Sequence, residues 1–495
     1  MKIKKYLWVL LLLFVIGGCE SLEDTYSDYA GDGAIRYLGK CKNLSVSPGW
    51  KRLIVQWDNH VDPVIDKIKV SWTIDRLTRD TILEKGTTEC NIPNLINGTY
   101  EISVSSMDKD GNCSLPILAY ERPYTATHEN VLSFTRVVNK HFFVKDRLAL
   151  IFTDWYSNLE TAELNYYSGG KIKVLELDST FITDNKCFLL PDEIDSGTKV
   201  IVKRTGRLEG CSDLINFDTY ELTHDKIYTP GFKQLLRKQY GQTEVSEAFV
   251  ATLKELYFDY NMETFEDILN IPGLKTLVLG KNRYLNEQYL DYYEDNSEVS
   301  AIERSTFALK VANEVLGLKV KRYNKHYFAD ETFPFMEDME NPIVPERSFL
   351  NSQQWTYSCS NEEYGEGIRN LFDENTTEEG WEPVRHTSPY TYEIIVDMQE
   401  SKNINGVQIT QKLRRPTSKY AKLIAKSIQI KVSNDNQTWN DATYVEENIL
   451  GNTSGETTII GFSKIKSARY LKFIVSDQAY NSFYYSVSLG KIRIF

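Results

Sequence analysis

Five acidic side chains and one tryptophan lie within fourteen residues of the sequence, in the segment NLFDENTTEEGWEP at 370–383. Carboxylates this close together suit a general acid/base pair, a calcium-binding loop or a solvated turn. A catalytic pair also needs a cleft and a residue that positions water or a nucleophile. Because Asp373 and Glu374 are adjacent, and Glu378 and Glu379 crowd a second turn, the segment fits a solvated loop of a binding module better than an active site. A calcium ion near Asp373 stays open, since calcium prefers oxygen ligands of this kind.

Three loops near the C-terminal end carry side chains that suit recognition of a sugar. They read WEPVRH at 381–386, KLRRP at 412–416 and AYNSFYY at 479–485. An aromatic face stacks on a pyranose ring, while arginine, histidine and asparagine side chains bond its hydroxyl groups. We expect the loops to meet at one rim, where the candidate ligand-binding residues are His386, Arg414, Arg415, Asn481, Phe483, Tyr484 and Tyr485. In an extended segment one of the two adjacent tyrosines would instead belong to the core.

Length and charge limit the classes of protein to which the chain can belong. With 495 residues it exceeds what one hydrophobic core usually holds, so we expect several domains. Its formal net charge of -12 provides no broad positive field for nucleic acid or an anionic membrane surface. The cysteines beyond position 19 form no CxxC pair, so a structural zinc site is not expected, and their spacing selects no disulfide pairing.

The first 18 residues have the form of an export signal. Lysines precede an apolar run from Tyr6 to Ile16, which is too short to cross a bilayer as a helix. Gly17 and Gly18 then precede Cys19, an arrangement that resembles a bacterial lipobox, in which the cysteine is lipidated. The acidic residues 19–40 read as a tether and resemble the surface-export signal of Bacteroidetes lipoproteins. The resemblance implies a protein of the outer membrane, held at the cell surface by lipid on Cys19.

Residues 41–125 and 126–222 both read as β-sandwiches. Polar and apolar residues alternate in RLIVQW, KIKVSW and YEISVS, as they do in half-buried strands. The first segment resembles a fibronectin type III domain, with Trp57 and Tyr100 at the positions of its core tryptophan and corner tyrosine. In the second segment DRLALIF echoes KRLIVQW and EGCS echoes GNCS, so we interpret it as a duplicate of the first. Both are expected to act as spacers.

Residues 223–339 are rich in leucine. LKELYFDYN at 253–261 and LKTLVLGKN at 274–282 match the pattern of a leucine-rich repeat, in which the leucines face the core and the asparagine bonds the backbone. Two copies are too few for a free solenoid, so we expect a small α/β domain with a helix near 300–316. The leucines either bind a protein partner or simply build a core. Residues 340–348 read as a proline-containing linker.

Residues 349–495 contain strand-like segments without a convincing helix, which predicts an antiparallel jelly-roll sandwich in a chain that is multidomain and mainly β. NLFDENTTEEGW, YEIIVDMQESKNINGVQI, SIQIKVSNDNQTW and ARYLKFIV resemble, in order, the characteristic phrases of a discoidin, or coagulation factor 5/8 type C, domain. Trp381 and Trp439 match tryptophans that are often core in that family. The calcium loop departs from the family at Glu374, in place of glycine, and at Lys491, in place of an acid.

The resemblance implies a non-enzymatic lipoprotein that binds carbohydrate through residues 349–495 and accompanies a glycan-uptake complex of the outer membrane. One alternative is an adhesin that binds a protein through the leucine repeats or the discoidin-like tip, and another is a glycoside hydrolase with attached modules. Against an enzyme, the sequence holds no HExxH, GxSxG, phosphate-loop or dinucleotide motif. We expect no cofactor, with calcium near Asp373 left open, no nucleic acid partner, and membrane contact only through the lipid.

Overall fold

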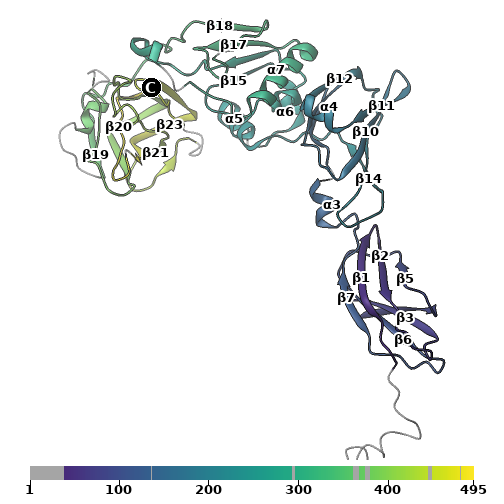
Figure 1. Ribbon diagram of the computed structural model, residues 1–495. Coiled ribbons are helices and arrows are strands. Elements are labelled where there is room, and N and C mark those ends of the chain that lie inside the picture. The colour runs from purple at the N-terminus through teal and green to yellow at the C-terminus, as the bar shows by residue number, and fades with distance from the viewer. Residues whose placement is uncertain are drawn as a thin grey trace, which may run out of the picture.

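The computed structural model describes residues 38–134, 136–242, 244–292, 296–329, 331–360, 367–373, 379–443, 449–479 and 481–495. Cys19, the tether up to residue 37, the acidic segment 374–378 and Tyr480 lie outside these described residues. The described chain is multidomain and mainly β, which confirms the predicted fold class. Figure 1 shows a first sandwich, a second sandwich, an α/β domain and a C-terminal sandwich following one another along the chain. Among the described helices, none is long and apolar enough to cross a membrane.

The first sandwich packs a sheet of three strands against a sheet of four. The three strands are, in sheet order, β1 (Lys42–Gly49), β2 (Arg52–Asp58) and β5 (Glu89–Ile92). The four are β4 (Leu77–Glu84), β3 (Lys67–Ile74), β6 (Tyr100–Met107) and β7 (Ile117–Glu121). The alternation read from the sequence places Trp57 and Tyr100 in the core, and the Tyr100 hydroxyl accepts a hydrogen bond from the backbone nitrogen of Ile96 (3.2 Å).

The second sandwich has the same order of strands in both of its sheets as the first. Its smaller sheet contains β12 (Cys187–Glu193), β9 (Arg147–Phe152) and β8 (Val138–Val144). Its larger sheet contains β11 (Lys171–Leu177), β10 (Leu159–Ser168), β13 (Val200–Gly206) and β14 (Ile215–Leu222). Two short helices, α3 (Glu129–Phe134) and α4 (Ser179–Asp184), lie in its connections. The six cysteines among the described residues are all free thiols.

The α/β domain contains a parallel sheet with the order β15 (Glu255–Phe258), β16 (Thr276–Leu279), β17 (Lys319–Tyr323) and β18 (Met336–Met339). Its helices are α5 (Pro230–Tyr240), α6 (Glu247–Thr252) and α7 (Ile302–Leu316), with 3-10 helices η1 (Glu266–Asn270) and η2 (Glu287–Tyr292). The repeat leucines lie in its core rather than on a surface, and Phe142 and Ile151 of the second sandwich belong to the same core. One face of the smaller sheet of the second sandwich therefore packs into the core of the α/β domain, while its other face packs into a separate core of the sandwich.

The two repeat asparagines differ in their partners. The side-chain oxygen of Asn261 accepts a hydrogen bond from the backbone nitrogen of Glu298 (2.9 Å), as the repeat pattern predicts, whereas among the described residues the bonds of Asn282 go to a side chain. Its side-chain nitrogen donates to the carboxylate of Asp259 (2.9 Å), which also accepts a bond from the Asn282 backbone nitrogen (3.0 Å). Just before it, Gly280 turns the chain at φ +74°, and a Cβ atom there would lie 2.0 Å from the His326 ring. The turn that follows β16 is thus built around a buried histidine.

The C-terminal sandwich is organised by two long strands, β20 (Thr391–Thr410) and β23 (Thr457–Ser476), which pair along three stretches separated by two register shifts. The shifts bend both strands, so each contributes to both halves of a jelly roll around one core. Trp381 is fully buried in that core, as expected. The remaining elements are β19 (Thr356–Cys359), η3 (Ile368–Leu371), β21 (Gln429–Ser433), β22 (Asn440–Asp441), β24 (Gln478–Ala479), β25 (Tyr485–Ser486) and β26 (Lys491–Ile494).

A buried ion pair joins the α/β domain to the C-terminal sandwich. The Arg283 guanidinium donates to both carboxylate oxygens of Glu456 (2.8 and 2.7 Å), and both side chains are fully buried. Beside it, the backbone nitrogen of Thr457 donates to the carbonyl of Tyr284 (2.9 Å). Because a buried charge is costly unless it is paired, these contacts fix the two domains together.

Candidate functional site

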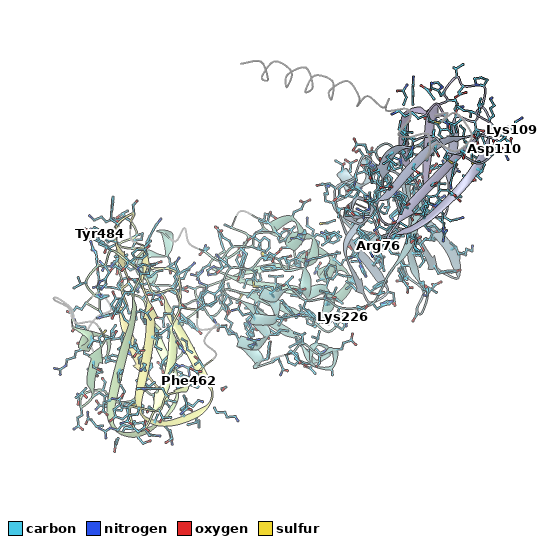
Figure 2. All side chains as sticks on the ribbon, turned by 90° about the horizontal axis from the view of Figure 1, so that it is seen from below. Arg76, Lys109, Asp110, Lys226, Phe462 and Tyr484 are labelled. Carbon is cyan, nitrogen blue, oxygen red and sulfur yellow. The ribbon has the colours of Figure 1, made fainter. Side chains whose placement is uncertain are left out.

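The three candidate loops meet at one end of the C-terminal sandwich, which we call the rim (residues 381–390, 412–424 and 477–486). His386 and Tyr485 exchange backbone hydrogen bonds (3.1 and 2.7 Å), which joins the first loop to the third. The side chain of Gln478, which directly precedes the third loop, donates to the carbonyls of Lys422 and Ile424 (2.6 and 2.5 Å) in the segment that follows the second loop. Figure 2 shows Tyr484 at this end and Phe462 at the opposite end of the sandwich.

A carboxylate orders the arginines of the rim. Glu382 forms an ion pair with Arg414 and a second one with Arg385 (3.5 Å), so it connects the first loop to the second. Both guanidiniums lie over the ring of Tyr420, at 5.6 Å for Arg414 and 4.7 Å for Arg385. Arg415, the other predicted arginine, is exposed and belongs to the same loop. The result is a half-buried cluster in which the guanidinium groups are held in place before any ligand arrives.

The predicted aromatic residues divide into exposed and packed ones. Phe483 and Tyr484 are 73% and 44% exposed, whereas Tyr485 is half-buried in β25. Asn481 is exposed, and its side-chain oxygen accepts hydrogen bonds from the backbone nitrogens of Phe483 and Tyr484 (2.9 Å each). This asparagine therefore shapes the turn that presents the two rings, and the exposed rings remain available for stacking.

His386 is half-buried and packs into the floor of the rim. Its ring stacks on Tyr390 with centroids 5.1 Å apart. The backbone nitrogen of Tyr390 donates to the carboxylate of Asp477 (2.9 Å). Burial raises the pKa of Asp477, whose second carboxylate oxygen has no partner within the described residues. His386 thus orients neighbouring rings, and Asp477 supplies a carboxylate beneath them.

The sequence predicted the three loops but not four residues that complete the rim. The residues that were not predicted are Glu382, Tyr390, Tyr420 and Asp477. Glu382 lies within the first loop, and Tyr390 comes shortly after that loop. Tyr420 lies six positions beyond Arg414 in an irregular segment, where a lone tyrosine gives no periodic signal. The arginines could be proposed from the sequence, whereas the carboxylate that orders them could not.

The calcium prediction falls mostly outside the described residues. Asp373 is half-buried at the edge of the acidic loop, of which residues 374–378 are not described. Within the described ranges, no three or more His, Cys, Asp or Glu side chains form a group that could hold a metal ion. Lys491, which replaces the acidic residue of the family, is buried in β26.

Comparison with family models gives two matches to parts of the chain. Residues 19–179 match DUF4998, a domain of unknown function, and residues 354–488 match the F5/8 type C domain. No curated protein matches the chain.

Solved structures similar to the chain include the CBM32-1 module of a family 31 glycoside hydrolase from Clostridium perfringens. It is 15% identical, with 29% of this chain and 94% of that module covered and a TM-score of 0.24. The C-terminal domain of a chitobiase from Bacteroides fragilis is 22% identical, with 30% and 97% covered and a TM-score of 0.25. A CBM32 module from Clostridium perfringens in complex with GalNAc-β-1,3-galactose is 17% identical, with 30% and 99% covered and a TM-score of 0.24. The family match and the jelly-roll topology together identify the C-terminal sandwich of this chain as an F5/8 type C domain.

Proposed function

We propose that this protein is a non-enzymatic surface lipoprotein that binds carbohydrate through the rim of its C-terminal sandwich. The observation that carries the proposal is the F5/8 type C match, combined with exposed rings and ordered guanidiniums at one end of that domain. The first two sandwiches and the α/β domain act as spacers that hold the rim away from the membrane. In this role the protein captures glycan for an uptake complex of the outer membrane.

The rim would bind a sugar by stacking and by charge-assisted hydrogen bonds. The exposed ring of Tyr484 offers an apolar face to a pyranose ring. Arg385 and Arg414 offer donors to its hydroxyl groups, and their ion pairs with Glu382 reduce the freedom that they lose on binding. Each such contact contributes about 1 kcal/mol or more, so several together are needed for useful affinity.

A glycan-array screen followed by calorimetric titration tests this role. Tyr484→Ala should weaken binding of the captured glycan about tenfold, because it removes the stacking face. Its melting temperature should stay close to that of the wild type, since the ring is 44% exposed. Tyr167→Ala in the second sandwich, where the ring is 39% exposed, serves as the matched control and should bind normally. An array without a bound glycan, together with capture of a protein partner at the rim, would favour the adhesin instead.

The proposed membrane anchor depends on Cys19. Lipid on this cysteine would hold the chain at the membrane, with an affinity set by the buried acyl chains. Cys19→Ala should therefore move the protein from the membrane fraction to a soluble or uncleaved form, which fractionation and mass measurement detect. Cys113→Ala, which replaces an exposed thiol of the first sandwich, is the control. Unchanged membrane association of Cys19→Ala would contradict the lipid anchor.

A further inference from the structure

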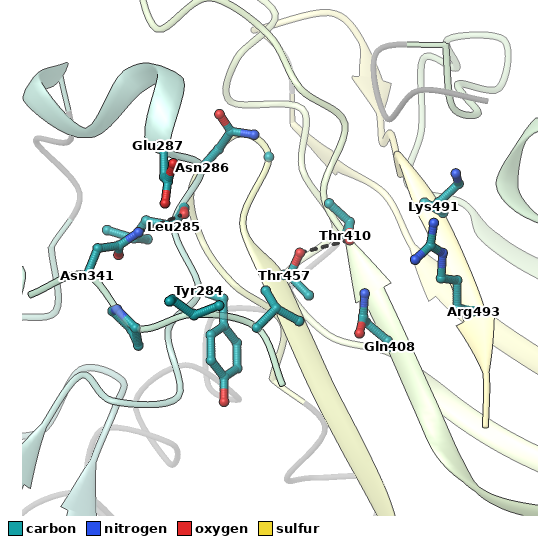
Figure 3. Close-up of a pocket in the computed structure, with 14 residues that line it drawn as sticks. Tyr284, Leu285, Asn286, Glu287, Asn341, Gln408, Thr410, Thr457, Lys491 and Arg493 are labelled. Atoms are coloured by element: carbon teal, nitrogen blue, oxygen red, sulfur yellow. Dashed lines mark hydrogen bonds between the residues drawn. The ribbon is translucent and has the colours of Figure 1, made fainter. Parts of the chain in front are cut away.

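A groove of about 720 Å³ lies between the α/β domain and the C-terminal sandwich. Residues 284–287 of the α/β domain form a first wall, residues 341–344 form a second wall beside it on the same side, and β20, β23 and β26 supply the floor that faces them (Figure 3). A volume of this size falls within the range of roughly 300–1,000 Å³ that small-molecule sites occupy. The described rim residues do not line it, so the groove is a separate feature.

The floor of the groove is built from two rows of side chains that cross the sheet. In one row Lys491 lies beside Thr410, which pairs with Thr457, and the two threonine hydroxyls are hydrogen-bonded (2.9 Å). In the other row Arg493 lies beside Gln408. Since residues two apart in a strand share a face, Lys491 and Arg493 present their charges on the same side of the sheet. The floor thus places two cations, a largely buried Lys491 and a half-buried Arg493, next to neutral hydrogen-bonding groups.

Hydrogen bonds hold the walls in place without a ligand. The bond from the Thr457 nitrogen to the Tyr284 carbonyl attaches the first wall to the floor. On the second wall, the side-chain oxygen of Asn341 accepts a bond from the amide of Asn324 (2.9 Å). Ile343 lies on the same wall with its side chain 85% exposed. A site that is already formed loses less conformational freedom when a ligand binds.

The chemistry of the lining favours a ligand with both hydroxyl and anionic groups. Gln408 is half-buried and lines the groove, and its side-chain nitrogen can donate to a ligand hydroxyl. Asn286 adds an amide nitrogen that can donate, whereas the Asn341 amide already bonds Asn324 and the Leu285 carbonyl (3.5 Å). The planar guanidinium of Arg493 matches a carboxylate. Even with Glu287 on the wall, the lining carries a net positive charge in a chain whose net charge is -12.

We propose that this groove binds a saccharide that carries carboxylate groups, such as a uronate-containing oligosaccharide. Its carboxylate lies against Lys491 and Arg493, while its hydroxyl groups accept hydrogen bonds from the side-chain nitrogens of Gln408 and Asn286. The inference goes beyond the function proposed for the rim and uses different residues, so either site can fail without the other.

Titration of the full-length protein in detergent with trigalacturonate tests the groove, and neutral galactotriose serves as the uncharged probe. Arg493→Gln should weaken trigalacturonate binding about tenfold or more, because it removes a charge-assisted contact. Ile343→Trp should weaken it equally, since a larger side chain on an exposed wall position obstructs the groove without entering the core. Ile465→Trp, at an isoleucine that is 64% exposed on β23 and does not line the groove, is the matched control and should bind normally.

The outcomes separate the groove from the rim. In support of the groove, Tyr484→Ala should leave trigalacturonate affinity within about twofold of the wild type, because distant sites act independently. Loss of binding in Tyr484→Ala but not in Ile343→Trp would place the acidic sugar at the rim and overturn the groove proposal, leaving the rim function intact. Absence of trigalacturonate binding to the wild type, or equal affinity for galactotriose at the groove, would also overturn it.

Discussion

Two bidentate arginine–carboxylate pairs join neighbouring domains of this protein, and they differ in their exposure to water. Between the two N-terminal sandwiches, Arg52 donates to both oxygens of Asp213 (3.0 and 2.6 Å), and their side chains are 30% and 22% exposed. Between the α/β domain and the C-terminal sandwich, Arg283 and Glu456 make the same kind of contact with both side chains fully buried. Both pairs thus join an arginine to a carboxylate, and they differ in their exposure to water.

The difference in exposure determines what each pair does for the molecule. Water can replace either partner of the Arg52–Asp213 pair, so its loss is easily compensated. In the buried joint, removal of one partner leaves a charge without water or a counterion. We therefore expect the N-terminal joint to tolerate changes, whereas the C-terminal joint keeps the α/β domain and the F5/8 type C domain in a fixed arrangement. That arrangement also forms the interdomain groove.

The largest effect should come from Arg283→Ala. The substitution leaves Glu456 buried without its counterion, and Ser297 loses the hydrogen bond from the guanidinium (2.8 Å). Breaking a buried pair in this way costs about 3–5 kcal/mol. Denaturant unfolding followed by tryptophan fluorescence should show the C-terminal transition at a clearly lower concentration. A loss of less than about 1 kcal/mol would mean that the joint behaves like an exposed pair.

The double variant Arg283→Met with Glu456→Met is the control for that experiment. It removes both charges and keeps much of the buried volume, so it should recover most of the lost stability. If the double variant is as unstable as Arg283→Ala, packing at this position and not the unpaired charge explains the loss.

A smaller, pH-dependent effect is expected from His326, a fully buried neighbour of the same joint. Burial, together with the nearby Arg283 charge, lowers the pKa of His326 to about 3. Its Nδ1 accepts a hydrogen bond from the backbone nitrogen of Ser297 (2.9 Å). An unfolded histidine takes up a proton near pH 6.5, while the folded one stays neutral until about pH 3. Stability is therefore lost as the pH falls through this window, by about 2 kcal/mol between pH 7 and pH 5.

His326→Asn should remove this part of the pH dependence, since asparagine keeps an acceptor for Ser297 but does not titrate. Unfolding free energies at pH 7 and pH 5 for both proteins provide the measurement. His60→Asn, which changes an exposed histidine of the first sandwich, should retain the acid sensitivity of the wild type. An undiminished acid sensitivity in His326→Asn would show that other groups cause it.

The sequence predicted elements with a local period far better than contacts made across the fold. Alternation in KIKVSW and the pattern around Leu256 depend on neighbouring residues. Strand β3 formed where it was expected, and Leu256 is buried in the core. The buried pair of Arg283 and Glu456 had no signal, because its partners lie 173 positions apart and both residue types usually face water.

In the rim, too, the contacts between separate segments could not be predicted from the sequence. Its aromatic and arginine residues could be proposed because their types suit sugar binding. The ordering of Arg414 by Glu382 depends on two loops meeting after the sandwich has folded. The prediction for Asn282 failed for a related reason. Its side chain donates to the nearby Asp259 carboxylate, which is a stronger acceptor than a backbone carbonyl and which no sequence pattern indicated.

The smallest effect should come from Asp213→Ala at the exposed joint. Asp213 accepts three hydrogen bonds, two from Arg52 and one from the backbone nitrogen of Trp50 (2.9 Å), so it is more than a simple surface pair. Because the side chains remain accessible, water should solvate Arg52 and the Trp50 nitrogen once the carboxylate is gone. We expect a loss of about 1 kcal/mol or less in the unfolding free energy of the N-terminal sandwiches. Glycan binding at the rim should stay unchanged, since the rim lies in a different domain. A loss as large as that of Arg283→Ala would show that exposure does not separate the two joints.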